Sequence, residues 1–93
     1  MQLGMIGLGR MGANIVRRLH RNGIECVVRD RDPEVVAALV VEGVATGAAS
    51  IEELVSALAG PRAVWVMVPA GIAGQVVAEV AQHLDAGDTV IDG

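Results

Sequence analysis

Several residue types are missing from this sequence or nearly so. It has no lysine, phenylalanine or tyrosine, and only one tryptophan and one cysteine. Without lysine, with a single aromatic residue and with no recognised binding motif, the chain does not fit a nucleic-acid-binding protein. One cysteine, Cys26, excludes an internal disulfide and a cysteine-rich metal site. We therefore expect Cys26 to be a packed, reduced thiol, and we expect no metal.

Long apolar runs are also missing. The longest stretch without a charged residue, residues 63–78, contains Pro69 and two glycines, and these residues interrupt it well short of a transmembrane span. The first residues lack a basic region followed by an apolar segment, so we expect no signal peptide. These features predict a cytoplasmic protein without a membrane partner. Ninety-three residues, 53% of them hydrophobic and 19% charged, predict one folded domain over residues 1–93.

Positive charge is absent from most of the chain. Residues 1–31 carry six arginines against two acids, a net charge of +4, whereas residues 32–93 carry one arginine against nine acids, a net charge of −8. The basic third contains the most glycine-rich turn of the sequence. This distribution suits an anionic small ligand, although outward-facing arginines on solvated helices explain it equally well.

The turn itself has the spacing G-x-G-x-x-G, formed by Gly7, Gly9 and Gly12. An apolar run over residues 3–6 predicts a strand before it, and apolar spacing predicts a helix over residues 10–21 after it. In this context the first glycine permits a tight turn, the second permits close approach of a pyrophosphate, and the third lets the helix pack closely. Glycines that serve only a tight turn are the alternative. We predict an anion site on the backbone of Leu8, Gly9, Arg10 and Met11.

Asp30 follows the second predicted strand, residues 24–29, and lies 18 residues after Gly12. A carboxylate at this position is expected to accept a hydrogen bond from a ribose 2′-hydroxyl and to repel a 2′-phosphate, which favours NAD over NADP. Arg31 leaves the choice open, because a guanidinium could stack on adenine or pair with a 2′-phosphate. Asp32 has a sufficient structural role as the N-cap of the next helix.

The remaining pattern alternates strands and helices. It predicts an α/β fold of the Rossmann type, a doubly wound parallel sheet with strand order 3-2-1-4-5 and helices on both faces. Trp65 falls in the fourth strand and is expected in the core. Val68, Pro69, Ala70 and Gly71 follow that strand and are expected to face the glycine loop across the cofactor. The predicted strands are 3–6, 24–29, 44–45, 63–68 and 89–91, and the predicted helices are 10–21, 33–42, 51–59 and 72–84.

Four segments together resemble the cofactor domain of 6-phosphogluconate dehydrogenases, especially their shorter, NAD-preferring bacterial branch: residues 7–12, Asp30, residues 68–71 and residues 87–93. The glycine motif is shared with 3-hydroxyisobutyrate dehydrogenases. The resemblance implies an oxidoreductase of the pentose phosphate pathway, in which hydride transfer from a 3-hydroxyacid precedes decarboxylation. Its lysine base and other catalytic groups would lie after Gly93. We thus expect no catalytic residue here, no substrate domain, and a possible homodimer only in the full-length enzyme.

NADP-using members of that family carry Asn-Arg-Thr where this sequence has Asp30, Arg31 and Asp32. The arginine matches, but the two acids make NAD the expected cofactor and NADP the less favoured one. Arg29 stands where relatives often have an aromatic residue, which leaves the adenine to aliphatic side chains and arginine stems. A stand-alone nucleotide-binding or interaction module without catalysis is the alternative function, and self-association through uncovered apolar surface is a third possibility.

Overall fold

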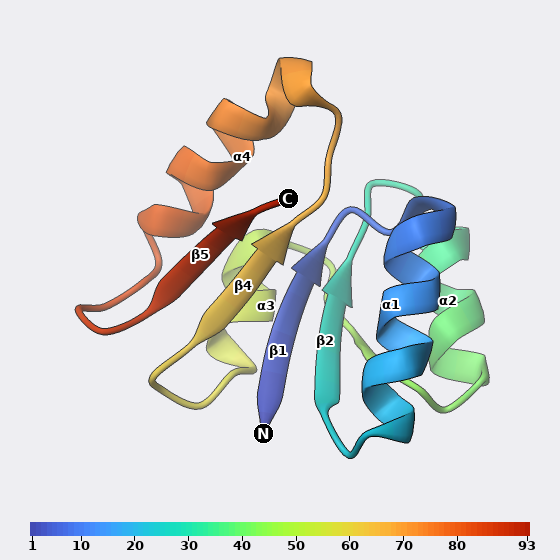
Figure 1. Cartoon of the computed structure of the whole chain (residues 1–93). Helices are drawn as coiled ribbons and strands as arrows, with labels where there is room; N and C mark the ends of the chain where they lie inside the picture. Colours follow the sequence, from blue (N-terminus) through green and yellow to red (C-terminus); the bar gives the residue numbers. More distant parts are fainter.

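A computed structural model describes all residues from Met1 to Gly93. Strands and helices alternate along the whole chain, as the sequence pattern predicts (Figure 1). No helix is long and apolar enough to cross a membrane. The elements are β1 (Gln2–Ile6), α1 (Gly9–Arg21), β2 (Glu25–Arg29), α2 (Pro33–Val41), β3 (Thr46–Gly47), α3 (Ile51–Ser56), β4 (Ala63–Val66), α4 (Ala70–Ala81) and β5 (Thr89–Asp92).

All five strands belong to one parallel sheet in the order β3-β2-β1-β4-β5. This order confirms the predicted doubly wound α/β arrangement. In the centre of the sheet, Met5 of β1 is paired with Val28 of β2 on one side and with Trp65 of β4 on the other. Because parallel strands all end at the same edge, the turns that follow β1, β2 and β4 lie together.

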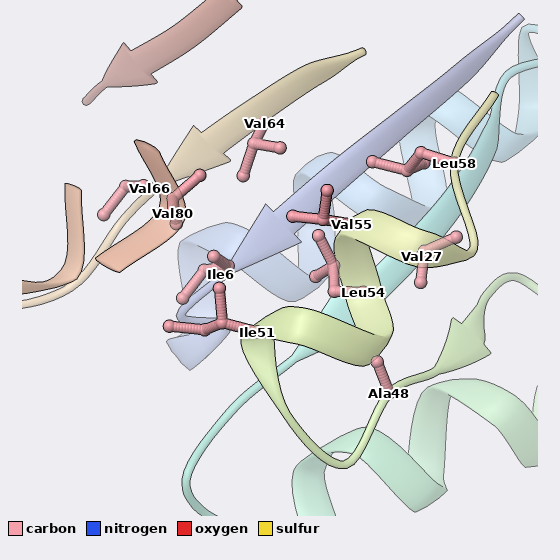
Figure 2. Close-up of a cluster of buried hydrophobic side chains, with 10 residues drawn as sticks. All are labelled: Ile6, Val27, Ala48, Ile51, Leu54, Val55, Leu58, Val64, Val66 and Val80. Carbon is pink, nitrogen blue, oxygen red and sulfur yellow. The ribbon is translucent and has the colours of Figure 1, made fainter. Parts of the chain in front are cut away.

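Two apolar cores cover the two faces of the sheet. One is formed by α3 and α4 against Ile6, Val27, Val64 and neighbouring side chains (Figure 2). The other is formed by α1 and α2 against Met5, Cys26 and Val28 and includes the fully buried Leu8. Alternate residues of each strand point to opposite faces, so consecutive residues such as Met5 and Ile6 belong to different cores.

Two glycines end helices, and the strands that follow them begin later in the sequence than predicted. Gly23 and Gly43 have φ values of +79° and +78°. After each of them the next amide turns back to a helix carbonyl, Ile24 to Leu19 and Val44 to Leu39. These bonds form the Schellman arrangement. They engage the amides of Ile24 and Val44, the first residues of the two predicted strands, so these amides are not free to pair with a neighbouring strand. As a result β2 begins at Glu25 rather than at residue 24, and β3 lies two residues after the predicted strand 44–45.

Other boundaries and exposures differ modestly from the prediction. Helix α4 begins at Ala70 because the Pro69 carbonyl accepts hydrogen bonds from the amides of Ile72 and Ala73. Val40 is 44% exposed, because α2 covers an edge strand of only two residues. Met11 is 67% exposed at the start of α1. Trp65 packs against the second core, as predicted.

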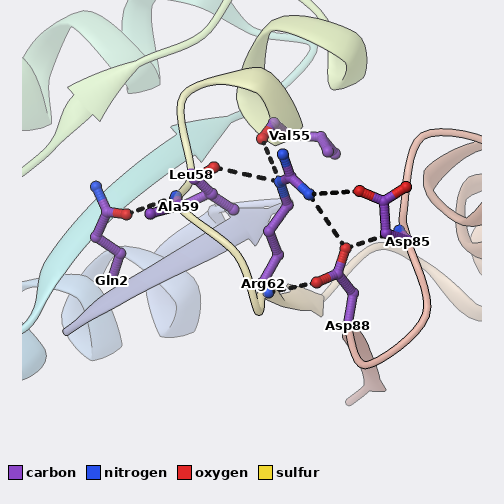
Figure 3. A network of polar contacts seen from close by, with 7 residues as sticks. All are labelled: Gln2, Val55, Leu58, Ala59, Arg62, Asp85 and Asp88. Atoms are coloured by element: carbon purple, nitrogen blue, oxygen red, sulfur yellow. Dashed lines mark hydrogen bonds and ion pairs between the residues drawn. The ribbon is translucent and has the colours of Figure 1, made fainter.

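Polar contacts join the amino-terminal ends of β4 and β5 to α3. The Arg62 side chain donates hydrogen bonds to the carbonyl oxygens of Val55 and Leu58 and pairs with the carboxylates of Asp85 and Asp88 (Figure 3). Asp88 in turn accepts from the amides of Arg62 and Asp85, at 2.6 and 2.8 Å. These two donated bonds, with the first the larger cause, lower the pKa of Asp88. At this end of the sheet, the charged side chains therefore pair with one another and with backbone groups.

Candidate functional site

The turn between β1 and α1 needs glycine at two positions for steric reasons. Gly7 has a φ of +86°, and a Cβ there would lie 2.6 Å from the carbonyl oxygen of Met67. A Cβ on Gly12 would lie 2.7 Å from the carbonyl oxygen of Gly7. Side chains at these positions would push β4 and α1 away from the turn. The first and third glycines therefore hold the turn close to its neighbours.

The second glycine faces open space. A Cβ on Gly9 would meet no atom within 4 Å, and the residue has a φ of +37°. The backbone amides of Gly9, Arg10 and Met11 donate to no other group of the chain. They begin α1, whose first turn carries no acidic side chain. Free amides at the positive end of a helix dipole can hold an anion such as a pyrophosphate.

The Leu8 amide differs from its neighbours because it has a partner within the chain. It donates to Oδ2 of Asp30 at 2.8 Å, and Oδ1 of Asp30 accepts from the amide of Asp32 at 2.9 Å. Asp30 is half-buried and remains in contact with solvent. Each carboxylate oxygen can accept a second hydrogen bond, so Asp30 can still receive a hydroxyl donor. Leu8 was predicted to offer its amide to a phosphate, and without a ligand that amide is already used.

A cleft of about 430 Å³ opens at the carboxyl ends of β1, β2 and β4. It brings together seven of the twelve predicted binding residues. The other five do not line it: Gly12 is buried, the side chains of Arg10 and Met11 line a separate hollow on the outer face of α1, and Ala70 and Gly71 are exposed in the first turn of α4. The seven lining residues are Gly7, Leu8, Gly9, Asp30, Arg31, Val68 and Pro69.

The cleft has a wall that the sequence analysis did not identify. Ile72, Val76 and Glu79 of α4 contribute to it, together with Ile51 at the start of α3. The spacing of 72, 76 and 79 places these residues on one face of a helix. The predicted helix 72–84 already contains all three residues, but its spacing does not show that this face borders the cleft. The wall is apolar apart from Glu79, and it lies across the cleft from Arg29, Asp30 and Arg31.

Cys26 does not line the cleft. Cys26 is buried in the second core, and burial raises the pKa of its thiol, so the reactive thiolate is disfavoured. The structure brings no three histidine, cysteine, aspartate or glutamate side chains together as a metal site. What the cleft offers is the free amide of Gly9, one carboxylate at the end of β2, two arginines and a wall that is apolar apart from Glu79. The free amides of Arg10 and Met11 follow Gly9 at the start of α1.

Comparisons with known proteins agree with this geometry. Residues 2–93 match the family described as the NAD binding domain of 6-phosphogluconate dehydrogenase. The chain is 45% identical over 94 residues to the NAD(+)-dependent, decarboxylating 6-phosphogluconate dehydrogenase of Haloferax volcanii, which covers all of this chain and 31% of that protein. It is 43% identical over 96 residues to the decarboxylating 6-phosphogluconate dehydrogenase of Treponema pallidum, which covers 98% of this chain and 20% of that protein.

A solved structure shows the same arrangement. The 6-phosphogluconate dehydrogenase of Plasmodium falciparum superposes with a TM-score of 0.89 at 26% identity, over all of this chain and 21% of that one. The chain thus spans between about a fifth and a third of the length of the relatives it matches. The family match extends over nearly every residue, from the first strand to the end of the last. The chain belongs to the family of NAD-binding domains of 6-phosphogluconate dehydrogenase.

Proposed function

We propose that this chain binds NAD as the cofactor domain of a dehydrogenase that oxidises and decarboxylates a 3-hydroxyacid such as 6-phosphogluconate. The observation that carries the proposal is the row of free amides at Gly9, Arg10 and Met11, which opens beside Asp30. In this proposal the amides hold the dinucleotide's pyrophosphate, and the carboxylate accepts a hydrogen bond from a hydroxyl of its adenosine ribose. The bound nicotinamide would supply the hydride acceptor.

The adenine is proposed to lie beyond Asp30, between Arg31 and the wall of α4. Ile51, Ile72 and Val76 give that wall an apolar surface, which suits the flat face of a purine. No phenylalanine or tyrosine is available for stacking, so the guanidinium of Arg31 is the planar group that can cover the other face. Val68 and Pro69, at the end of β4, would then flank the nicotinamide half of the cofactor.

The preference for NAD over NADP is part of the proposal. The relative from Haloferax volcanii is named as NAD(+)-dependent, whereas the Plasmodium falciparum structure is described with its cofactor NADP+. In this chain Asp30 and Glu79 both line the cleft. Two carboxylates there disfavour a 2′-phosphate, and Arg29 and Arg31 offset part of that repulsion.

Calorimetry with four ligands at one salt concentration tests this proposal: NAD, NADP, ADP-ribose and ADP-ribose 2′-phosphate. We expect NAD to bind about tenfold more tightly than NADP, and the two shorter ligands to show the same ratio, because the discrimination arises at the adenosine ribose. A preference for the phosphorylated ligands would show that Arg31 outweighs Asp30. Binding of none of the four would refute the site.

A further inference from the structure

We propose that Asp30 positions the glycine loop, in addition to facing the ribose. This inference rests on the proposed function only in taking the loop as a pyrophosphate site. Its basis is the hydrogen bond from the Leu8 amide to Oδ2 of Asp30, which joins residues 22 apart in the sequence. Asp30 is therefore a positioning residue for the three free amides that follow Leu8.

The bond extends the pairing of β1 and β2 beyond the strands. The last backbone bond on this side runs from the Gly7 amide to the Arg29 carbonyl oxygen, at 2.9 Å. One residue further the chain turns into α1, and the Asp30 side chain replaces the backbone acceptor. The Leu8 side chain is 1% exposed in the core beneath. Leu8 is consequently fixed from both sides, by its side chain and by its amide.

Fixing Leu8 sets the direction of the residues after it. Gly9, at a φ of +37°, has open space where a Cβ would lie, and its amide donates to no group of the chain. The orientation of the free amides of Gly9, Arg10 and Met11 therefore depends on the orientation of the Leu8 peptide that precedes them. Donors held in place before the ligand arrives bind it with less loss of conformational entropy. The carboxylate thus promotes anion binding by orienting amides, even though its own charge repels the anion.

Aspartate meets this requirement better than its uncharged analogue. Its two oxygens accept from Leu8 and from Asp32 at the same time. Asparagine has one acceptor oxygen, and its amino group would face one of those N–H donors. Substitution of Asp30 is therefore expected to weaken NAD and NADP together, rather than only to exchange one preference for the other.

The test compares Asp30→Ala with Asp32→Ala. Both remove one carboxylate from the same turn, and both remove an acceptor for the amide two residues later, but only Asp30 contacts the glycine loop. The first measurement is hydrogen exchange of the Leu8 amide without ligand, with the Gly7 amide as internal reference. The second is the affinity for inorganic pyrophosphate, which has no ribose and so makes no use of Asp30 as a hydroxyl acceptor.

We expect Asp30→Ala to speed exchange at Leu8 by about tenfold relative to Asp32→Ala and to weaken pyrophosphate binding by about fivefold. Asp32→Ala, which removes the same charge but no bond to the glycine loop, should leave pyrophosphate binding equal or slightly tighter. Unchanged exchange at Leu8 in Asp30→Ala, or pyrophosphate binding as tight as in Asp32→Ala, would overturn the inference. If the parent chain binds no pyrophosphate, the proposed function fails, and the exchange measurement alone decides whether Asp30 positions the loop.

Discussion

The two ends of the parallel sheet differ in whether their polar groups have hydrogen-bond partners within the chain. At the amino-terminal end, Arg62 and Asp88 satisfy carbonyls, amides and each other, and Asp88 has a side chain only 2% exposed. At the carboxyl-terminal end, the amides of Gly9, Arg10 and Met11 have no partner, and Gly9 lines a cleft. One end of the sheet is closed by its own side chains, and the other is left open.

This difference separates stability from binding within a small domain. A buried charge is tolerated only when it is paired, so the network at the closed end is sensitive to the loss of any member. Free helix amides cost little where solvent reaches them, and they remain available to a ligand. Substitutions at the closed end should therefore change stability and spare binding, while substitutions at the open end should do the reverse.

The largest expected effect is on binding, from Gly9→Val. The side chain would project into the space above the free amides, where a Cβ meets nothing in the ligand-free chain. Losing charge-assisted bonds from these amides, each worth about 1.5 to 3 kcal/mol, should weaken NAD binding by at least about 100-fold. Gly43→Val is the control, because Gly43 also has a positive φ and open surroundings but lies outside the cleft. Calorimetry should find its NAD affinity unchanged, and equal losses in both variants would contradict the assignment.

Arg62→Ala should have the opposite effect: it should lower the stability of the fold and leave NAD binding unchanged. It removes four side-chain contacts and leaves the buried carboxylate of Asp88 without its cation. We expect the free energy of unfolding to fall by about 2 to 3 kcal/mol. Urea denaturation measures this, with Arg18→Ala as an exposed control. A change of more than about twofold in NAD affinity, well above what such a distant site should transmit, would show that the two ends are coupled.

The third prediction concerns the stability of the folded chain at acidic pH. The pKa of Asp88 is lowered in the folded chain, so its contribution to stability is complete above the ordinary aspartate value of about 3.9 and is lost as the pH falls through the lowered value. In Asp88→Asn, the melting temperature should therefore fall less steeply between neutral and strongly acidic pH than in the parent. Asp85→Asn, which alters a carboxylate that is 83% exposed, should follow the parent curve. Parallel curves for Asp88→Asn and the parent would contradict the role of this network.

The smallest effect is expected for a pair that belongs to neither end. Arg17 of α1 and Glu42 after α2 form a two-bond ion pair, 2.8 Å in each bond, with both side chains 40% exposed. Their mutual hydrogen bond raises the pKa of Arg17 and lowers that of Glu42. Solvent screens such pairs, so Glu42→Gln should lower the melting temperature by no more than about 2 °C. A larger decrease in a thermal melt would mean that the contact between α1 and α2 depends on this pair.

The sequence predicts the open end better than the closed one. The alternation of strands and helices, the glycine turn and the place of Asp30 at the end of a strand follow from local spacing, because each is set by neighbouring elements of the chain. The strand order then follows from the fold type that this alternation predicts. The Arg62 network joins residues 23 and 26 positions apart, and no local pattern marks such partners. It depends on where the β4 and β5 turns meet in space, which only the assembled sheet determines.

Within the site, the errors have the same origin. The bond from the Leu8 amide to Asp30 was not predicted, because side-chain acceptors for a loop amide depend on how two strand ends are aligned. The α4 wall of Ile72, Val76 and Glu79 was missed because the spacing of the predicted helix does not show which of its faces borders the cleft, and this depends on how α4 packs on the sheet. Local periodicity predicts these elements, but the contacts between them are known only from the folded structure.

The most direct test of the division between the two ends is an amide chemical-shift titration of the labelled chain with NAD. We predict that the shifted resonances include Gly9, Arg10, Met11 and Asp30 at the open end, while those of Arg62, Asp85 and Asp88 stay in place. Shifts centred on the Arg62 network, or on the outer face of α1 without Gly9, would contradict the assignment of binding to the carboxyl-terminal end of the sheet.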